Sequence, residues 1–218
     1  MTPHQTTFDC NENANAAFTA APCSAFRCIV ADPPWQIERI ANMPRGKVQN
    51  PTVEVPYKTL SVEEISALPV REMADKTAHL YLWTINRFVE QSYGIARAWG
   101  FRPVQLLTWA KTPRGICLGT FTSSTEFVLF CRRGTLNANK RIDTTWWNWP
   151  RKKNHSQKPE EFQTLVESVS PGPYLELFAR RKRLGWSAWG NEIACDVEMP
   201  NAALCRDSGS RGGAQNEQ

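Results

Sequence analysis

Four consecutive residues, Asp32-Pro33-Pro34-Trp35, have the types and the spacing to do chemistry on a planar amine. They supply a carboxylate, a rigid turn and a flat aromatic face. Proline has no N–H group, so the neighbouring carbonyls stay free to accept hydrogen bonds. The amino group of adenine is a poor nucleophile because its lone pair is delocalised into the ring. Hydrogen bonds from its two N–H groups to the Asp32 carboxylate and the Pro33 carbonyl would stabilise the positive charge that develops as the nitrogen attacks a methyl carbon.

The tetrapeptide therefore predicts methyl transfer to an adenine amine, with Asp32, Pro33, Pro34 and Trp35 as the catalytic residues. Trp35 would stack on the base and hold it for in-line transfer. A structural alternative stays open, in which the segment is a turn that ends a strand. In that alternative Asp32 caps a helix and Trp35 belongs to the core.

Basic residues are concentrated in the middle of the chain. The whole chain has 26 Lys and Arg against 21 Asp and Glu, but residues 102–183 alone have 15 against 6, an excess of nine positive charges. Such a concentration matches the electrostatic footprint of a phosphate-binding surface, so nucleic acid is the expected partner. A solvated basic face is the alternative for any single cluster.

Three tryptophans, Trp146, Trp147 and Trp149, stand beside Arg151 and Lys152 in a segment that contains Pro150. Aromatic side chains next to basic ones can stack on flipped bases and hold backbone phosphate. Trp146, Arg151 and Lys152 are therefore candidate substrate-binding residues. The segment is equally well explained as a loop that packs on a partner subunit.

The pattern of apolar residues predicts strands and helices in alternation. We expect strands at 26–31, 80–83, 104–110, 126–131, 174–178 and 186–189, and helices at 62–68, 86–99 and from 160 to the Pro-Gly-Pro at 171–173. Ser61 and Glu64 form a capping-box pattern for the first helix, and Gly100 is a natural terminator for the second. The alternation predicts one α/β domain with a mostly parallel sheet flanked by helices, whose ligands lie at the carboxyl ends of the strands.

The composition bounds the class of protein. A chain of 218 residues with 41% hydrophobic and 22% charged residues is of ordinary globular type. We expect a flexible arm at 1–24, a catalytic domain at 25–195 and a flexible tail at 196–218. No stretch approaches the ~18 uninterrupted apolar residues of a membrane span. No Lys or Arg precedes Arg27, which argues against a signal peptide. These features predict an intracellular location in the cytoplasm or nucleoid, or in the host cytoplasm for a phage-encoded protein.

The seven cysteines are scattered without a Cys-x-x-Cys pair, and the chain has three histidines. A disulfide framework or a zinc site would need closer, repeated spacing. We therefore expect reduced thiols, no membrane association and no bound metal.

Several segments in a fixed order give the sequence a resemblance to the MT-A70 family of S-adenosylmethionine-dependent adenine N(6)-methyltransferases. Each segment is weak alone, but the ordered set, from about Cys28 to Glu192, is specific. In chain order the segments are ADPPW, VPYKTLSVEEI, LYLWTINRF, the Lys111-Thr112 pair, the strand with Glu126, SQKPEEF, SPGPYLELFARR and GWSAWGNE.

The resemblance implies a Rossmann-like methyltransferase fold with permuted motif order, and S-adenosylmethionine as the cofactor. It implies one group of residues that bind the cofactor: Asp32, Lys158, Phe178, Arg180, Lys182, Arg183, Asn191 and Glu192. It implies a second group that binds the substrate: Tyr57, Glu126, Ser156 and Lys158. Lys182 and Arg183 depart from the family pattern, because they stand where the messenger-RNA enzyme has His-Asn.

DNA is the substrate that the resemblance favours, because a short chain without RNA-binding modules is closest to the bacterial and phage members of the family. Methylation of RNA is one alternative. A catalytically silent subunit that binds nucleic acid is another, disfavoured because Asp32, Lys158, Asn191 and Glu192 are all present. A small-molecule methyltransferase fits the basic middle of the chain less well. The sequence leaves open whether the protein forms a homodimer or pairs with a second family member.

Overall fold

The computed structural model describes residues 26–36, 59–111, 120–150 and 157–200. These residues fold around a sheet with the strand order β5-β3-β4-β2-β1-β6-β7. Within the described residues β4 pairs antiparallel with both β2 and β3, and the other neighbouring pairs are parallel. The prediction of a mostly parallel sheet is confirmed. The strands are β1 (Phe26–Ala31), β2 (Ala74–Thr84), β3 (Arg102–Ala110), β4 (Thr125–Arg133), β5 (Trp146–Trp147), β6 (Tyr174–Leu177) and β7 (Trp186–Trp189).

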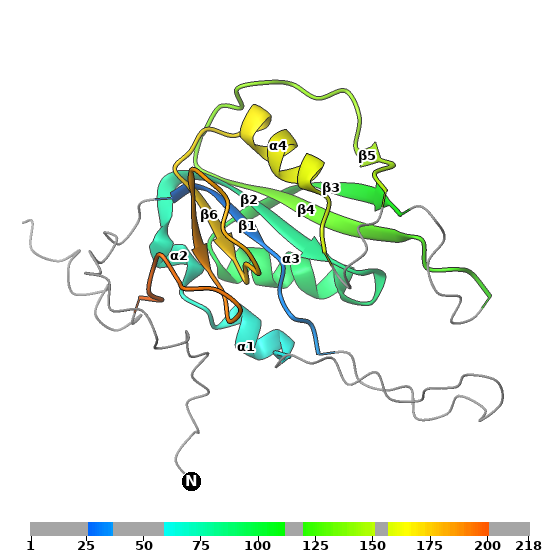
Figure 1. Cartoon of the computed structure of the whole chain (residues 1–218), viewed down its shortest axis with the longest axis horizontal. Helices are drawn as coiled ribbons and strands as arrows, with labels where there is room; N and C mark the ends of the chain where they lie inside the picture. The colour runs from blue at the N-terminus through cyan, green and yellow to red at the C-terminus, as the bar shows by residue number, and fades with distance from the viewer. Residues whose placement is uncertain (1–25, 37–58, 112–119, 151–156, 201–218) are drawn as a thin grey trace, which may run out of the picture.

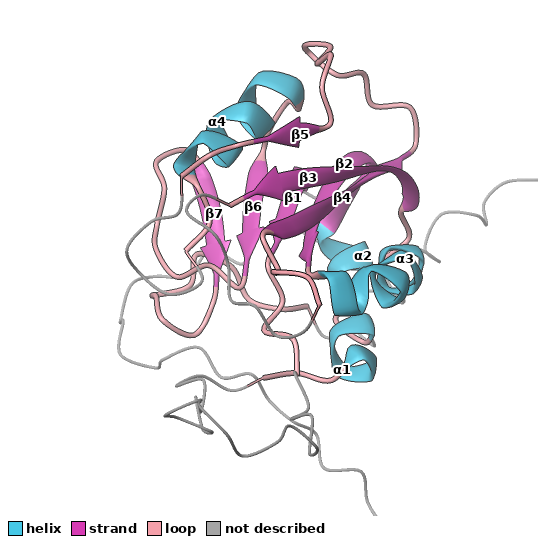
Figure 2. Cartoon of the chain, turned by 90° about the vertical axis from the view of Figure 1, so that its right-hand side faces the viewer, coloured by secondary structure: helices cyan, strands magenta, loops and turns pink. Residues whose placement is uncertain are grey.

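Helices cover both faces of the sheet (Figure 1). One face carries α4 (Glu160–Val169). The turned view in Figure 2 shows that the other helices lie on the opposite face. They are α1 (Val62–Ser66), α2 (Val70–Met73), and α3 (Val89–Ala98) with the 3-10 turn η1 (Asn86–Phe88) before it. This layered arrangement is the α/β domain that the apolar pattern predicts, and it agrees with the Rossmann-like fold that the resemblance implies.

Alternating side chains on the central strands build a core on each face. On β1, Ile29 is buried with the residues of α1 to α3, while its neighbour Val30 is buried on the α4 side with Val166. The same alternation holds on β2, where Leu82 and Trp83 point to opposite faces. Both strands are therefore apolar on both sides, as expected for parallel strands between two helical layers.

Local sequence signals fix several boundaries. Glu64 N donates to Ser61 Oγ and Ser61 N donates to the Glu64 carboxylate, so the predicted capping box is confirmed and α1 begins at Val62. Gly100, with φ +81°, adopts the left-handed conformation that favours glycine and ends the α3 segment as predicted. β1 and β7 have the predicted bounds.

The apolar pattern does not predict α2, β5 or the first half of β2. α2 is a single turn, too short for a periodic signal. β2 begins at Ala74 and continues through the polar residues 75–77, so backbone pairing rather than apolar alternation defines its start. β5 is two residues long and is held by β3, with Thr108 N donating to Thr145 O at 2.8 Å.

The packed domain continues past residue 195, where the sequence favoured a flexible tail. Val197 is buried in the core beside Cys195, and the Asp196 carboxylate accepts from Ala188 N at 3.1 Å. Residues 1–25 and 201–218, which contain the predicted arm and most of the predicted tail, lie outside the described residues.

Cysteines in the described residues differ in state. Cys28 and Cys131 are buried free thiols, as expected. Cys195 is disulfide-bonded, so the prediction of reduced thiols is wrong at that residue. Among the helices that the structure describes, none combines the length and the hydropathy needed to cross a membrane.

Candidate active site

The carboxyl ends of β1, β6 and β7 meet at one edge of the sheet because these strands are parallel neighbours. Asp32 follows β1 at this edge. β1 has β2 as its neighbour on one side and β6 on the other. The strand order therefore reverses at β1, and Asp32 lies at this point. Open α/β sheets bind ligands at such points. Antiparallel β4 begins at the same edge, and it contributes Glu126 from a strand that runs in the opposite direction.

Four charged side chains of alternating sign form a connected row at this edge. Lys158 Nζ lies 2.8 Å from Asp32 Oδ2 and 3.4 Å from Glu126 Oε2. The other Glu126 oxygen, Oε1, lies 3.1 Å from Lys111 Nζ. The Lys158 ammonium also lies 5.1 Å from the centre of the Trp83 ring, within reach of a cation–π interaction. Lys158 thus holds the two carboxylates together.

The charged row is largely buried, with exposed fractions from 12% for the Lys111 side chain to 24% for that of Asp32. Burial raises the pKa of the Asp32 carboxyl above its ordinary value, and the neighbouring Lys158 opposes that rise. Burial acts to lower the pKa of Lys158, but Asp32 and Glu126 outweigh it and the pKa is raised. At Glu126 the two lysines outweigh burial and lower the pKa of the carboxyl. The surroundings of Asp32 therefore disfavour its ionised form on balance, whereas the two lysines beside Glu126 favour the ionised form of that carboxyl.

A cavity of about 350 Å³ opens beside Asp32. Its volume is typical of a small-molecule site, and its walls combine apolar surface with acidic, basic and amide groups. The lining residues are Val30, Asp32, Trp83, Gln157, Lys158, Pro159, Phe162, Gln163, Glu176, Phe178, Arg180, Arg181 and Glu192.

The turn after Asp32 is fixed by its own hydrogen bonds. Trp35 N donates to Pro33 O at 2.9 Å, and Leu60 N donates to Pro34 O at 2.9 Å. The directions of the two carbonyls are therefore fixed, as expected, but neither carbonyl is wholly free as the sequence predicted, since each accepts one backbone hydrogen bond. Because a carbonyl oxygen has two lone pairs, the Pro33 carbonyl retains one acceptor position for a ligand.

Trp35 belongs to the core in this structure. Its ring stacks on Phe88 with the ring centres 4.9 Å apart and the planes 13° apart, and only 8% of the residue is exposed. The prediction that Trp35 offers its face to the target base is therefore wrong for this structure, and the structural alternative holds for the ring. The Asp32 carboxylate pairs with Lys158, so the part of the structural alternative in which Asp32 caps a helix does not hold.

The chain segments that leave β6 and β7 form one wall of the cavity. Phe178 adopts φ +62°, which is uncommon for a residue with a side chain. Gly190 lies so close to the other segment that an added Cβ would be 2.1 Å from Ala179 O. This close approach brings Arg180 and Glu192 to the same wall, where Arg180 Nε lies 3.6 Å from Glu192 Oε1. The predicted cofactor-binding residues Phe178, Arg180 and Glu192 therefore meet at the cavity.

Lys182 and Arg183 do not line the cavity. Lys182 Nζ lies 2.5 Å from the Asp196 carboxylate. Arg183 forms a two-pronged ion pair with Glu167 on α4, with both N–O distances 2.9 Å. The prediction that both residues bind the cofactor is therefore corrected. Each forms an ion pair with a carboxylate of this chain, and these pairs anchor the segment that follows β6.

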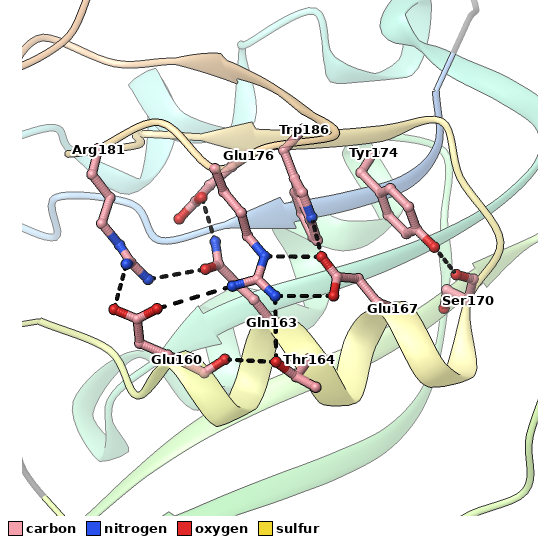
Figure 3. A network of polar contacts seen from close by, with 10 residues as sticks. Glu160, Gln163, Thr164, Glu167, Ser170, Tyr174, Glu176, Arg181 and Trp186 are labelled. Carbon is pink, nitrogen blue, oxygen red and sulfur yellow. Dashed lines mark hydrogen bonds and ion pairs between the residues drawn. The ribbon is translucent and has the colours of Figure 1, made fainter.

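The sequence patterns do not single out Gln163 and Glu176, which the structure places at the cavity together with Arg181 of the basic cluster at 180–183. Figure 3 shows their network: Arg181 pairs with Glu160 and donates to Gln163, whose amide donates to the Glu176 carboxylate. Burial raises the pKa of Glu176 to about 7. A sequence signal was present for Glu176, which interrupts an apolar strand, whereas the burial of Gln163 is visible only in the structure.

The remaining substrate candidates are only partly described. Trp146 is 58% exposed on β5 at the edge of the sheet, and Trp147 stacks on Trp149 with ring centres 5.3 Å apart. Trp147 pairs with Trp109 near the carboxyl end of β3, so this aromatic segment borders the site edge. Other candidates lie outside the described residues: Tyr57, Arg151, Lys152 and Ser156.

Asn191 is exposed and is not among the residues that line the cavity, whereas its neighbour Glu192 is. Of the two residues predicted to bind the cofactor together, only Glu192 lines the cavity in this structure.

The sequence similarity to known proteins covers the whole candidate site. Residues 26–192 match the MT-A70 family. An MT-A70-like protein of Medicago truncatula is 30% identical over 179 residues, which cover 78% of this chain and 26% of that protein. The type II methyltransferase M.MunI of a Mycoplasma species is 25% identical over 205 residues, 84% of each chain. The human N(6)-adenine-specific methyltransferase METTL4 is 27% identical over 191 residues, 77% of this chain and 37% of that protein.

This chain spans about a quarter of the length of the plant relative, but most of the length of M.MunI. The family match begins at the first residue of β1 and ends at Glu192. It therefore contains the Asp32 turn, the charged row and all the residues that line the cavity. On this match, which covers well over half of the sequence, the chain belongs to the MT-A70 family.

Proposed function

We propose that this protein transfers a methyl group from S-adenosylmethionine to the exocyclic amine of adenine in DNA. The observation that carries the proposal is the Asp32 carboxylate, which follows β1, is held by Lys158 at 2.8 Å and borders a cavity of about 350 Å³. The names of the relatives support the reaction, since they include N(6)-adenine and N(6)-adenosine methyltransferases.

In this mechanism Asp32 acts on the target amine. Its carboxylate accepts a hydrogen bond from one N–H group of the amine. The free lone pair of the Pro33 carbonyl accepts a hydrogen bond from the other N–H group. Both bonds favour a pyramidal nitrogen and stabilise the positive charge that grows on it during the attack. Lys158 favours the ionised form of Asp32 and fixes the direction of its oxygens. The methylated nitrogen loses its proton readily, so the reaction needs no strong base.

The chemistry of the cavity residues fits S-adenosylmethionine, which when bound supplies a methyl group activated on a sulfonium centre. Phe178 offers an aromatic wall, Glu192 offers acceptors for hydroxyl groups, and Arg180 offers a cation for a carboxylate. Val30 and Phe162 add apolar surface. Such a mixture of apolar walls and a few converging polar groups is typical of cofactor sites.

Two observations support DNA as the acceptor. M.MunI is matched over 84% of its own length, so the similarity covers nearly a whole type II methyltransferase. The excess of nine positive charges in residues 102–183 favours a polyanion over a small molecule. RNA is the second candidate, because the relatives named N(6)-adenosine-methyltransferases, such as human METTL3 at 27% identity, match most of the same residues.

The experiment is mass-spectrometric quantification of N(6)-methyladenine. The purified protein and S-adenosylmethionine are incubated separately with unmethylated duplex DNA, single-stranded DNA and RNA of one sequence. We expect transfer to DNA. Asp32→Asn keeps the shape of the side chain but removes its charge, and we expect it to lower the rate by about a thousandfold. Lys76→Met, at an exposed position of β2, is the matched control and is expected to keep the wild-type rate.

The other outcomes separate the parts of the proposal. Transfer to RNA but not to DNA would reverse the choice of acceptor and leave the chemistry intact. Cofactor binding without transfer to any polymer would indicate a different acceptor or a required partner. Neither binding nor transfer would contradict the proposal and favour a silent subunit. Near-normal turnover by Asp32→Asn would refute the amine-activation role of Asp32.

A further inference from the structure

We propose that Lys111 is a positioning residue of the reaction: it holds Glu126, which in turn holds Lys158 against Asp32. This role rests on the proposed methyl transfer. Lys111 directly follows β3, and its backbone N–H donates to Ser124 O at 2.7 Å. That bond fastens the end of β3 beside the start of β4, so the Lys111 side chain reaches Glu126 from a fixed backbone.

The Glu126 carboxylate divides its two oxygens between two lysines. Oε1 lies 3.1 Å from Lys111 Nζ, and Oε2 lies 3.4 Å from Lys158 Nζ. A carboxylate held at both oxygens has a defined orientation. Without Lys111, Glu126 would be held at one oxygen only and its terminal torsion would be free to turn. Lys158 would then lose a fixed anchor on the side opposite Asp32.

The charges lead to the same conclusion. The row Lys111, Glu126, Lys158 and Asp32 alternates in sign and is neutral as a whole. Removal of Lys111 leaves two carboxylates that compete for one cation in a largely buried site. Lys158 would then be drawn toward Glu126 at the expense of its 2.8 Å contact with Asp32. Lys111 therefore acts on the reacting amine only through other residues.

Phosphate binding is the usual alternative for a lysine near a nucleic-acid site. Two observations oppose it here. The Lys111 side chain is only 12% exposed, and its ammonium is already bonded to Glu126. A phosphate contact would require that bond to break. The two roles make different kinetic predictions, since a phosphate contact affects substrate affinity and a positioning contact affects turnover.

The test is a double-mutant cycle in methyl transfer to the DNA acceptor, with Lys111→Met, Glu126→Gln and the double variant. We expect Lys111→Met to lower kcat by about tenfold and to change KM for DNA by less than about twofold. In the Glu126→Gln background, Lys111→Met should have no further effect, because its action passes through Glu126. Lys111→Arg keeps the charge and should restore most of kcat. Lys76→Met is the matched control on the same sheet.

Circular dichroism and thermal melting identify any variant that fails to fold, and Lys111→Gln then replaces Lys111→Met. If the loss of kcat in the double variant equalled the product of the losses in the two single variants, the positioning role would be overturned. A raised KM for DNA at unchanged kcat would also overturn it, and would indicate a phosphate contact. A wild type that methylates no acceptor would overturn the proposed function and this role with it, whereas an active wild type that is insensitive at Lys111 would overturn this role alone.

Discussion

Asp32 can accept a hydrogen bond at each oxygen only while its carboxyl group is ionised. Burial raises the pKa of this carboxyl above its ordinary value of about 4. The charge of Lys158 lowers the pKa of Asp32, the charge of Glu126 raises this pKa, and the charge of Arg180 lowers it. As the pH falls through the raised pKa, Asp32 gains a proton and loses an acceptor position. The acidic limb of the pH–rate profile is therefore expected to follow the ionisation of Asp32.

Lys158→Met is expected to move that acidic limb to higher pH by about one unit or more, because it removes the cation that opposes the effect of burial on the Asp32 pKa. The measurement is kcat as a function of pH for the wild type and the variant, with Lys76→Met as the control. If the variant lost the same fraction of its rate at every pH, Lys158 would not set the ionisation of Asp32.

Single residues of the site differ in how far the sequence predicts them. Asp32 was predicted from the chemistry of its tetrapeptide, and Glu126 and Lys158 from the ordered segments of the resemblance. The structure brings all three together. The direction of a side chain is set by competing partners, which no motif contains. Arg183 shows this, because it lies close in sequence to the cavity residue Arg180 but pairs with Glu167. Trp35 shows it too, since Phe88 takes its ring into the core.

At the scale of elements, α4 both borders the cavity and holds the segment that follows β6. Its first turns contribute Phe162 and Gln163 to the cavity wall. One turn after Gln163 on the same helix face, the Glu167 carboxylate accepts from both Arg183 and the Trp186 indole. Figure 3 shows Glu167 pointing toward Trp186. The side chains of Arg183 and Glu167 are 23% and 30% exposed, so solvent screens the pair only in part.

Glu167→Gln is expected to lower the free energy of unfolding by about 1–2 kcal/mol, because a two-pronged ion pair becomes a single hydrogen bond from Arg183 to a neutral amide oxygen. The pKa of Glu167 is lowered by its hydrogen bonds from Arg183, so this stabilisation is present at neutral pH and is lost as the pH falls through the lowered pKa. Urea unfolding at pH 7 and at pH 3 measures it. An equal effect of the substitution at both pH values would contradict the argument.

Periodic elements were predictable, but their directions were not. The apolar pattern of β4 is the same for a parallel and an antiparallel strand, and the direction follows from how the chain enters it from β3. Glu126 reaches the site only because β4 begins at the carboxyl edge of its neighbours. Short elements such as α2 are likewise set by packing rather than by their own residues.

At the scale of the whole molecule, a buried polar cluster stabilises the fold far from Asp32. His79, which is fully buried on β2 opposite Cys28, contacts Ser170 Oγ through Nδ1 at 2.7 Å and Leu136 O through Nε2 at 3.2 Å. The carbonyl can only accept, so Nε2 carries the proton and Nδ1 accepts from Ser170. Tyr81 then donates to Ser170 Oγ at 2.8 Å. The cluster ties β2 to the end of α4 with a neutral imidazole.

Burial lowers the pKa of His79, so acid is expected to destabilise the protein through this residue. Above about pH 6.5 His79 is neutral in both states. Below that pH the unfolded chain binds a proton that the native state does not, and the free energy of unfolding falls with a slope of up to about 1.4 kcal/mol per pH unit until the lowered pKa is reached. Urea unfolding between pH 7 and pH 5 should show a smaller slope for His79→Gln. Equal slopes would contradict this account.

The place of β1 in the sheet has a consequence for biosynthesis. β1 is the earliest described strand, yet one of its two partners is β6, and Cys28 pairs with Tyr174 near the far end of the domain. A ribosome makes β2, β3, β4, β5 and α4 before the second side of β1 can be covered. Until then the nascent chain exposes an apolar strand edge and has no Phe178 or Arg180 beside Asp32. The candidate active site is therefore one of the last structures that the growing polypeptide completes.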